Sequence, residues 1–210
     1  MTHNDQRLRA TSIPADRGRG AASAVHGADG ASRDGARRSQ TLIIGAGRKR
    51  TPGAVHLDRV AATDPDVVHD LNVRPWPFAD GTFSEVIAHD VLEHLNDIVA
   101  VFEEIHRVST PGAIVQIVVP HFSCANAFTD PTHRHYFGWF SFDYFTGEHE
   151  FAFYTSVRFR TLRRAIIFAP TLFNKLVWRA ANRWPNRYEH RWAWIFPAWF
   201  LSAELEVIKP

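Results

Sequence analysis

The amino-acid sequence predicts an α/β domain built on a mostly parallel β-sheet. Two patterns indicate this class: short apolar runs, three of which stop at a glycine or an acidic residue, and one amphipathic stripe with helical spacing between two further apolar runs. Strands that alternate with helical or loop crossovers are typical of parallel sheets. The 210 residues suit one domain with extensions, and 45% hydrophobic with 22% charged residues is the balance of a chain that buries a core.

Four short strands are expected in the first half of the domain, at residues 42–44, 54–57, 67–69 and 83–88. Then the spacing changes, because Val91, Leu95, Ile98, Phe102 and Ile105 recur at steps of four and three. This stripe predicts a helix over 91–105, which the Thr-Pro-Gly sequence at 110–112 ends. The apolar run 113–119 then predicts a central strand that is covered on both faces.

The second half is rich in aromatic residues. Alternating apolar and polar residues predict one long strand or a hairpin over 151–167. A helix is expected over 172–184 and a closing strand over 204–208. A single cysteine, Cys124, excludes an internal disulfide. The sequence also has neither an apolar run of the roughly 20 residues that a membrane-spanning helix needs nor the apolar start of a secretory signal. These observations predict a cytoplasmic protein.

Residues 1–40 differ from the rest in composition. They hold seven arginines among small and polar residues and almost no large apolar side chains, so we expect a disordered basic tail. An arm that binds nucleic acid is the alternative, but no aromatic side chain accompanies these arginines to stack on bases. No nucleic-acid partner is therefore expected.

The residues that follow the strands predict a ligand site. Ligands of open parallel sheets bind outside the carboxyl ends of the strands. The residues at these ends are Gly45-Ala46-Gly47, Asp58, Asp70-Leu71 and His89-Asp90. Glycines let the backbone approach a ligand closely, and a carboxylate suits a ribose diol. Together these residues predict one shared crevice.

The same residues narrow the class of ligand. A dinucleotide fingerprint needs a third glycine and an acidic residue about 20 positions further on, whereas Arg50 takes the place of that glycine and Asp58 comes too early. The phosphate-loop pattern is absent as well. A ligand with ribose and adenine but no phosphate fits better, because it needs acidic acceptors.

Residues 77–95, PFADGTFSEVIAHDVLEHL, resemble a signature segment of the class I S-adenosylmethionine-dependent methyltransferases. The family pattern is roughly PF-x-D-x-(S/T)-F-D-x-(V/I), a strand, and then (V/L)-L-(E/H)-H-L. The resemblance extends from Leu42 to Pro120. It implies a Rossmann-like, three-layer αβα domain over 41–210 with a seven-stranded sheet. The last strand, 204–208, would be antiparallel and would follow an aromatic-rich insertion at 170–203.

The resemblance also implies S-adenosylmethionine as the cofactor. Gly45 and Gly47, with Ala46 between them, would face its methionine part, and Asp58 would bond the ribose hydroxyls. Asp70 would take the adenine amino group, with Leu71 against the ring. His89, followed by Asp90, would lie beside the sulfonium. The chain departs from the family where an acidic residue and a third glycine are common, at Ile43 and Lys49, and its 47–54 span is too short for the usual first helix.

Histidines after the fifth expected strand suggest a base. Transfer of a methyl group to a hydroxyl or amine needs a group that takes the proton, and histidine is the usual choice near neutral pH. His121 and His133 are the candidates, although histidines in a loop also satisfy backbone groups. A metal site built from His133 and His135, or from His89 and His94, is the competing interpretation. Neither spacing matches a standard site, so no metal is expected.

The sequence thus predicts methyl transfer to an oxygen, nitrogen or carbon nucleophile of a small molecule, a sugar or a lipid-linked intermediate. A methyltransferase-like protein that binds cofactor or partner without turnover is the alternative. Five tryptophans lie between residues 172 and 201, and Lys175, Arg179 and Arg183 recur every four residues. This segment is either a core-facing helix with a solvated basic face or an element that contacts a membrane or an amphiphilic substrate.

Overall fold

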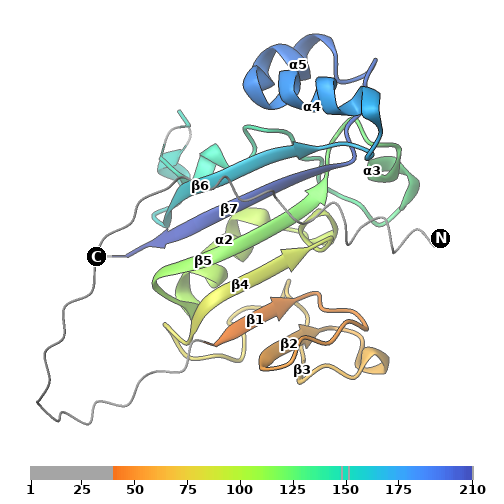
Figure 1. The fold of residues 1–210 in the computed structure, drawn as a ribbon. Coiled ribbons are helices and arrows are strands. Elements are labelled where there is room, and N and C mark those ends of the chain that lie inside the picture. Colours follow the sequence, from red (N-terminus) through yellow and green to blue (C-terminus); the bar gives the residue numbers. More distant parts are fainter. Residues whose placement is uncertain (1–39, 148, 151, 210) are drawn as a thin grey trace, which may run out of the picture. The chain divides into compact units, whose positions relative to one another are not determined.

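The structure of the protein, a computed structural model, describes residues 40–147, 149–150 and 152–209. The predicted basic tail, apart from Gln40, lies outside these residues. The described chain forms one seven-stranded sheet with the strand order β3-β2-β1-β4-β5-β7-β6 (Figure 1). The strands are β1 (Thr41–Ile44), β2 (Ala54–Asp58), β3 (Val67–Val68), β4 (Phe83–His89), β5 (Ser109–Pro120), β6 (Arg158–Ile167) and β7 (Phe200–Ile208).

The direction of the strands agrees with the prediction. β1 pairs in parallel with β2 and β4, and the β2–β3 and β4–β5 pairs are parallel too. β7 lies between β5 and β6 and is antiparallel to both. A mostly parallel sheet with a reversed last strand is therefore confirmed, and β7 contains the predicted strand 204–208.

The α-helices of the described chain are α2 (Ile98–Val108), α3 (Ala125–Thr129), α4 (Leu172–Arg183) and α5 (Pro185–Arg191). Short 3-10 helices lie at Ala61–Thr63 (η1), Leu92–His94 (η2), Asp143–Phe145 (η3) and Ala152–Tyr154 (η4). The predicted helix 91–105 is wrong at its start. The Asp97 carboxylate accepts a hydrogen bond from the Ala100 N–H at 2.9 Å and caps α2, so the preceding residues form the separate turn η2.

The chain between Phe151 and Ile167 also differs from a single long strand or a hairpin. β6 begins only at Arg158, after the turn η4. The predicted helix over 172–184 is confirmed as α4, and Pro185 at its end opens the new helix α5.

One face of the sheet carries the core. α2 packs on this face (Figure 1), and its Phe102 stacks on Phe145 with ring centroids 3.9 Å apart. Phe142 and Phe159 complete this aromatic cluster. All four rings are buried, so the loop between β5 and β6 is held to the sheet mainly by apolar contacts.

The opposite face is half-exposed and more polar. Glu85 lies at its centre, where its carboxylate accepts hydrogen bonds of 2.7 Å from the Thr41 hydroxyl and from the Gln116 amide. Right-handed crossovers place the β1–β2 and β2–β3 connections on the side opposite α2. These connections, 45–53 and 59–66, hold only turns and η1. Of the three layers expected, the described residues form the sheet and the α2 layer, and no long helix covers this face.

Arg107 at the end of α2 joins that helix to the loop before β4. Its guanidinium donates to both carboxylate oxygens of Glu104 at 2.9 and 2.7 Å, to Asp80 at 2.7 Å, and to the carbonyls of Trp76 and Phe78 at 3.0 and 2.8 Å. Glu104 in turn accepts the Trp76 N–H at 2.6 Å. The hydrogen bonds from Glu104 raise the pKa of Arg107 above its ordinary value. The guanidinium therefore fixes the approach to β4.

We expect Arg107→Lys to lower the free energy of unfolding by about 2 kcal/mol, because an ammonium cannot reproduce this forked set of charge-assisted bonds. The matched control is Arg74→Lys, which alters the exposed pair between Arg74 and Glu103 and should cost less than about 1 kcal/mol. Urea unfolding followed by circular dichroism measures both. Equal costs for the two variants would contradict the role given to Arg107.

Candidate functional site

A pocket opens at the carboxyl ends of β1, β2 and β4. It is lined by Gly45, Asp58, Arg59, His69, Asp70, Leu71, Asn72, Asp90, Val91, His94, Leu95 and Thr132. β1 and β4 are neighbours in the sheet, and the strand order reverses between them. Such a switch point is where open α/β sheets bind ligands, because the loops that leave the two strands diverge there.

Asp58, at the end of β2, ties the glycine turn to the pocket. One oxygen of its carboxylate accepts the Gly47 N–H at 2.8 Å, and the other accepts the Val60 N–H at 2.9 Å. The N–H groups of Gly45 and Ala46 donate to the Leu57 carbonyl at 2.9 and 3.3 Å. A carboxylate has about four acceptor sites. Asp58 thus remains able to accept bonds from a ligand while it holds the backbone on both sides.

Asp70 organises the loop after β3 in a similar way. Its Oδ1 accepts hydrogen bonds from the backbone and the side-chain amide of Asn72, both at 2.9 Å. The side-chain Oδ1 of Asn72 accepts the Asn96 backbone N–H at 2.8 Å, which connects this loop to the loop after β4. The neighbouring Leu71 is buried and forms an apolar wall. Two opposite sides of the pocket are thereby fixed to each other.

Gly45 is required by close packing. It has φ of 63°, and a Cβ added to it would lie 2.4 Å from a methyl carbon of Val91. Gly47 also has a positive φ, 56°, but its Cβ would meet no atom within 4 Å. The two glycines therefore serve different purposes: both permit a left-handed backbone, and only the first lets the turn pass against Val91, at the start of η2.

The charge of the pocket is predominantly acidic. Asp58, Asp70 and Asp90 contribute carboxylates, against one guanidinium from Arg59. Such a site favours a cationic ligand over a phosphate. These carboxylate acceptors therefore fit a ligand that combines a sulfonium cation with a ribose diol.

The family model described as a methyltransferase domain matches residues 47–117. Among solved structures, the YcgJ protein from Bacillus subtilis has a TM-score of 0.55 at 13% identity, with 83% of this chain and 93% of that chain covered. A SAM-dependent methyltransferase from Archaeoglobus fulgidus has a TM-score of 0.52 at 14% identity, with 80% and 86% covered. No curated protein sequence matches the chain.

The chain has the class I methyltransferase fold. Its strand order, its reversed β7 and the two structural neighbours agree on this point. The resemblance seen in residues 77–95 is therefore confirmed. In this methyltransferase fold, that segment forms the approach to β4, β4 itself and the turn η2.

Most of the predicted cofactor residues meet in the pocket of this methyltransferase fold. Gly45, Asp58, Asp70, Leu71 and Asp90 line it directly. Three others, Ala46, Gly47 and His89, are not among the lining residues. Ala46 is buried, Gly47 donates to Asp58, and His89 is half-buried at the end of β4, where burial lowers its pKa.

The two base candidates differ in their surroundings. His121 is fully buried, with its ring nitrogens 2.8 Å from the Ser123 hydroxyl and 3.1 Å from the Glu189 carboxylate. As placed, it offers no accessible nitrogen to an acceptor. His133 lies near the pocket, where its ring packs edge-on against His94 with centroids 4.6 Å apart.

Several lining residues were not predicted. His69, Asn72, His94 and Thr132 line the pocket beside the expected acids. The Asp-x-Asn spacing of 70–72 is a usable signal, because aspartate often bonds the backbone two residues on. Thr132 lies 42 residues after Asp90 in the sequence and reaches the pocket only through the path of the loop after β5.

We expect Gly45→Ala to lower the free energy of unfolding by about 1–3 kcal/mol more than Gly47→Ala. Both variants force an L-residue into a left-handed conformation, but only the first also forces a side chain onto Val91. Chemical denaturation of the two variants measures the difference.

Adding Val91→Ala to Gly45→Ala should recover part of the loss, because it removes the two methyl groups nearest the new side chain. Additive costs in the double variant would contradict the contact.

Proposed function

We propose that the protein is an S-adenosylmethionine-dependent methyltransferase and that the cofactor binds in the pocket at the β1–β4 switch point. The observation that carries this proposal is the convergence of Asp58, Asp70 and Asp90, which follow three different strands, on one acidic pocket. Sequence positions far apart supply the acceptors that a ribose, an adenine amino group and a sulfonium require.

The residues present fit such a ligand. The free acceptor sites of Asp58 suit the ribose hydroxyls, and the Oδ2 atom of Asp70, which has no hydrogen-bond partner among the described residues, suits an amino group. Leu71 and Val91 offer apolar contacts to a flat ring. The turn at Gly45 lines the same pocket and would face the methionine part.

When bound, the cofactor supplies an electrophilic methyl group. The chain contributes by holding that group and the acceptor in line and by excluding alternative geometries, which accounts for most of the acceleration in such transfers. His94 lies on the pocket wall and His133 directly behind it. We propose that these two imidazoles assist the removal of the acceptor's proton, because His121 is enclosed.

We expect calorimetric titration with S-adenosylmethionine to give saturable binding by the wild type. Asp58→Asn and Asp70→Asn should each weaken it by roughly 10- to 100-fold, because each removes a charged acceptor from the pocket. The control is Asp64→Asn, whose carboxylate is fully exposed and outside the pocket. No binding by the wild type at millimolar cofactor would contradict the proposal.

The acceptor is to be found by mass spectrometry of cell extracts incubated with the protein and isotope-labelled cofactor. Products expected are methylated small molecules, sugars or lipid-linked intermediates. Cofactor binding without any labelled product would favour the alternative, a methyltransferase-like protein that binds without turnover.

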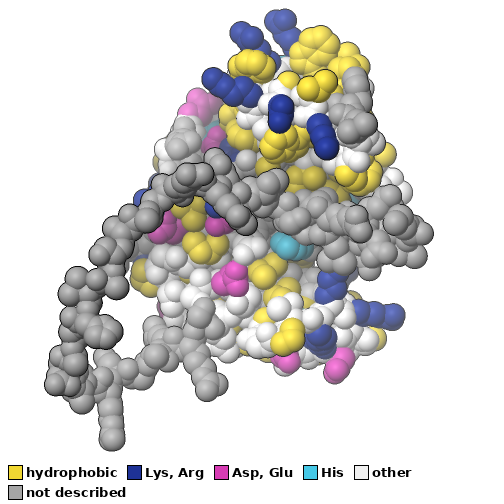
Figure 2. Space-filling model, in the orientation of Figure 1, with side chains coloured by type: hydrophobic (Ala, Val, Ile, Leu, Met, Phe, Trp, Pro, Cys, Tyr) yellow, Lys and Arg dark blue, Asp and Glu magenta, His cyan; other side chains and the backbone are white. Residues whose placement is uncertain are grey.

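The surface formed by α4, α5 and the residues that follow α5 favours a lipid-linked acceptor. We call this surface the aromatic–basic patch; it comprises Leu176, Trp178, Trp184, Trp192, Trp194 and Ile195 with Lys175, Arg179, Arg183, Arg187 and Arg191. Figure 2 shows hydrophobic and basic side chains mixed over this part of the molecule. The six apolar side chains are between 39% and 69% exposed.

The exposure of these side chains argues against the helix being simply core-facing. Among the α4 side chains that the structure describes, only Ala181 is buried, whereas Leu176 is 69% exposed. Tryptophan beside arginine, as in the contact of Arg183 with the Trp184 ring, is typical of elements that lie in a membrane interface. No helix in the described part of the chain is long and apolar enough to cross a membrane. On the exposed tryptophans beside arginines, we propose peripheral contact with an anionic lipid surface.

A groove between the two helices strengthens this proposal. Its lining is mostly apolar and includes one arginine: Val177, Ala180, Ala181, Trp184, Arg187, Tyr188, Trp192 and Phe196. Phe122, directly after β5, packs against Trp194 with ring centroids 5.5 Å apart. The patch therefore adjoins the loop after β5, at the same end of the sheet as the pocket.

We expect the protein to co-sediment with vesicles of phosphatidylserine and phosphatidylcholine, and less with phosphatidylcholine alone. Trp194→Ala and Arg179→Glu should each reduce binding several-fold. The matched controls are Phe153→Ala, which removes an aromatic ring that is 70% exposed elsewhere, and Arg163→Glu on β6. Equal losses in patch and control variants, or no vesicle binding by the wild type, would contradict membrane contact.

A further inference from the structure

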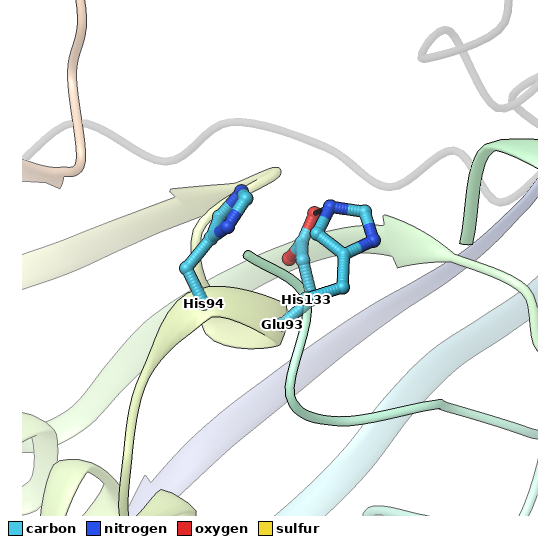
Figure 3. A group of neighbouring side chains, drawn as sticks. All are labelled: Glu93, His94 and His133. Carbon is cyan, nitrogen blue, oxygen red and sulfur yellow. Dashed lines mark ion pairs between the residues drawn. The ribbon is translucent and has the colours of Figure 1, made fainter. Parts of the chain in front are cut away.

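Two histidines and a glutamate meet beside the cofactor pocket. Glu93 and His94 belong to η2, and His133 comes from the loop after α3 (Figure 3). We call these three residues the Glu–His–His cluster. One possible ligand atom of each lies within 4.8 Å of the others. His133 comes 39 positions after His94 in the sequence, so only the fold brings them together.

The hydrogen bonds of His133 determine which of its nitrogens is available. Its Nδ1 lies 2.9 Å from the Ala127 carbonyl oxygen. A carbonyl can only accept, so Nδ1 carries the hydrogen, and in the neutral ring Nε2 presents a lone pair. That Nε2 is 4.0 Å from a carboxylate oxygen of Glu93, too far for a hydrogen bond and near enough to share a ligand with it.

The same reasoning applies to His94. Its Nδ1 is 2.8 Å from the Thr132 hydroxyl, which itself lies 2.7 Å from the Asp130 carboxylate. The hydroxyl gives its single hydrogen to the carboxylate, so it accepts from His94. Nδ1 of His94 is therefore protonated and Nε2 presents its lone pair.

We propose that the Glu–His–His cluster binds a divalent transition metal ion, with zinc as the best match. Two neutral imidazoles and one carboxylate form a recognised zinc ligand set. Each imidazole already donates its other N–H to an oxygen, as ligating histidines generally do. Glu93 is 1% exposed, and a positive charge beside it would stabilise a carboxylate at that depth.

The surroundings hold the ligands close to the geometry that a metal needs. The N–H of Arg134, next to His133, donates to the Glu93 carbonyl at 2.7 Å, which joins the two segments of the cluster. A tetrahedral zinc with bonds of about 2.1 Å holds its ligand atoms roughly 3.4 Å apart. The cluster would therefore contract on binding, through rotation of its side chains rather than movement of the backbone.

Three protein ligands leave one coordination position for water or substrate. His94 and Thr132 line the pocket, so that position would face the acceptor. This consequence rests on the proposed methyl transfer. An acceptor hydroxyl bound to the metal would lose its proton to water, and His94 and His133 would then act by holding the metal rather than by taking that proton themselves. The acceptor's oxygen–methyl bond would then form as the methyl–sulfur bond breaks, leaving a neutral thioether. Metal binding itself does not depend on this reaction.

The test is calorimetric titration of chelator-treated full-length protein with zinc chloride, without cofactor, together with metal analysis after dialysis. We expect one zinc ion per chain. Glu93→Gln, His94→Gln and His133→Gln should each weaken binding by at least about 100-fold, and Thr132→Val by roughly 10-fold through loss of the outer hydrogen bond. His190→Gln, an exposed histidine of α5, is the control.

Cobalt provides a second readout that a purely structural role would not affect. The cobalt-loaded wild type should give the visible absorption of a four-coordinate ion, and His133→Gln should lose it while keeping its circular dichroism spectrum. Absence of zinc binding by the wild type, or equal loss in the His190→Gln control, would overturn the proposal. Failure of cofactor binding with intact zinc binding would overturn only the proposed function.

Discussion

Right-handed crossovers constrain this molecule more than any single contact does. The chain runs outward from β1 to β3 and then returns to place β4 on the other side of β1. Because both halves obey the same handedness, their connections leave the sheet on opposite faces, and the loops after β1 and β4 diverge. The pocket is the space between those loops. Its base is so narrow that Gly45 passes Val91 only because it has no side chain.

The acids that would meet the ligand also build the site. Asp58 anchors backbone on both sides of β2, and Asp70 forms the turn whose Asn72 holds the loop after β4. A carboxylate held by backbone N–H groups is ordered before any ligand arrives, so less entropy is lost on binding. Loss of an acid would therefore affect both recognition and the shape of the pocket.

The loop after β5 relates the pocket to the other two proposed sites. Its beginning contacts α5 through His121 and Glu189 and contacts the aromatic–basic patch through Phe122 and Trp194. Further along, it delivers Thr132 to the pocket and His133 to the Glu–His–His cluster. One loop thus connects the proposed lipid-facing surface, the proposed metal site and the proposed cofactor pocket. This arrangement suits an acceptor that is presented from a membrane.

The strand ends could be predicted from sequence because burial and turn chemistry are local. Apolar runs that stop at Gly45, Asp58 and Asp70 identify β1 to β3 and their carboxyl ends without any knowledge of the packing. The helical spacing of the apolar residues over 91–105 is a weaker guide to the backbone. Val91 and Leu95 have helical spacing and are both buried, but they flank the 3-10 turn η2, and α2 begins only after its cap Asp97. Periodicity reports which residues are buried, not which backbone buries them.

The amino-acid sequence by itself determined the parallel sheet, the acidic strand ends and the segment 77–95 that identifies the methyltransferase fold. Only the tertiary structure decided which histidines face the site. His121 and His133 look equivalent along the chain, yet one is enclosed against Glu189 and the other meets Glu93 and His94. The physical reason is that contacts between distant segments depend on the path of the loop. That path is held by backbone bonds such as Arg134 to Glu93, which any residue except proline can donate.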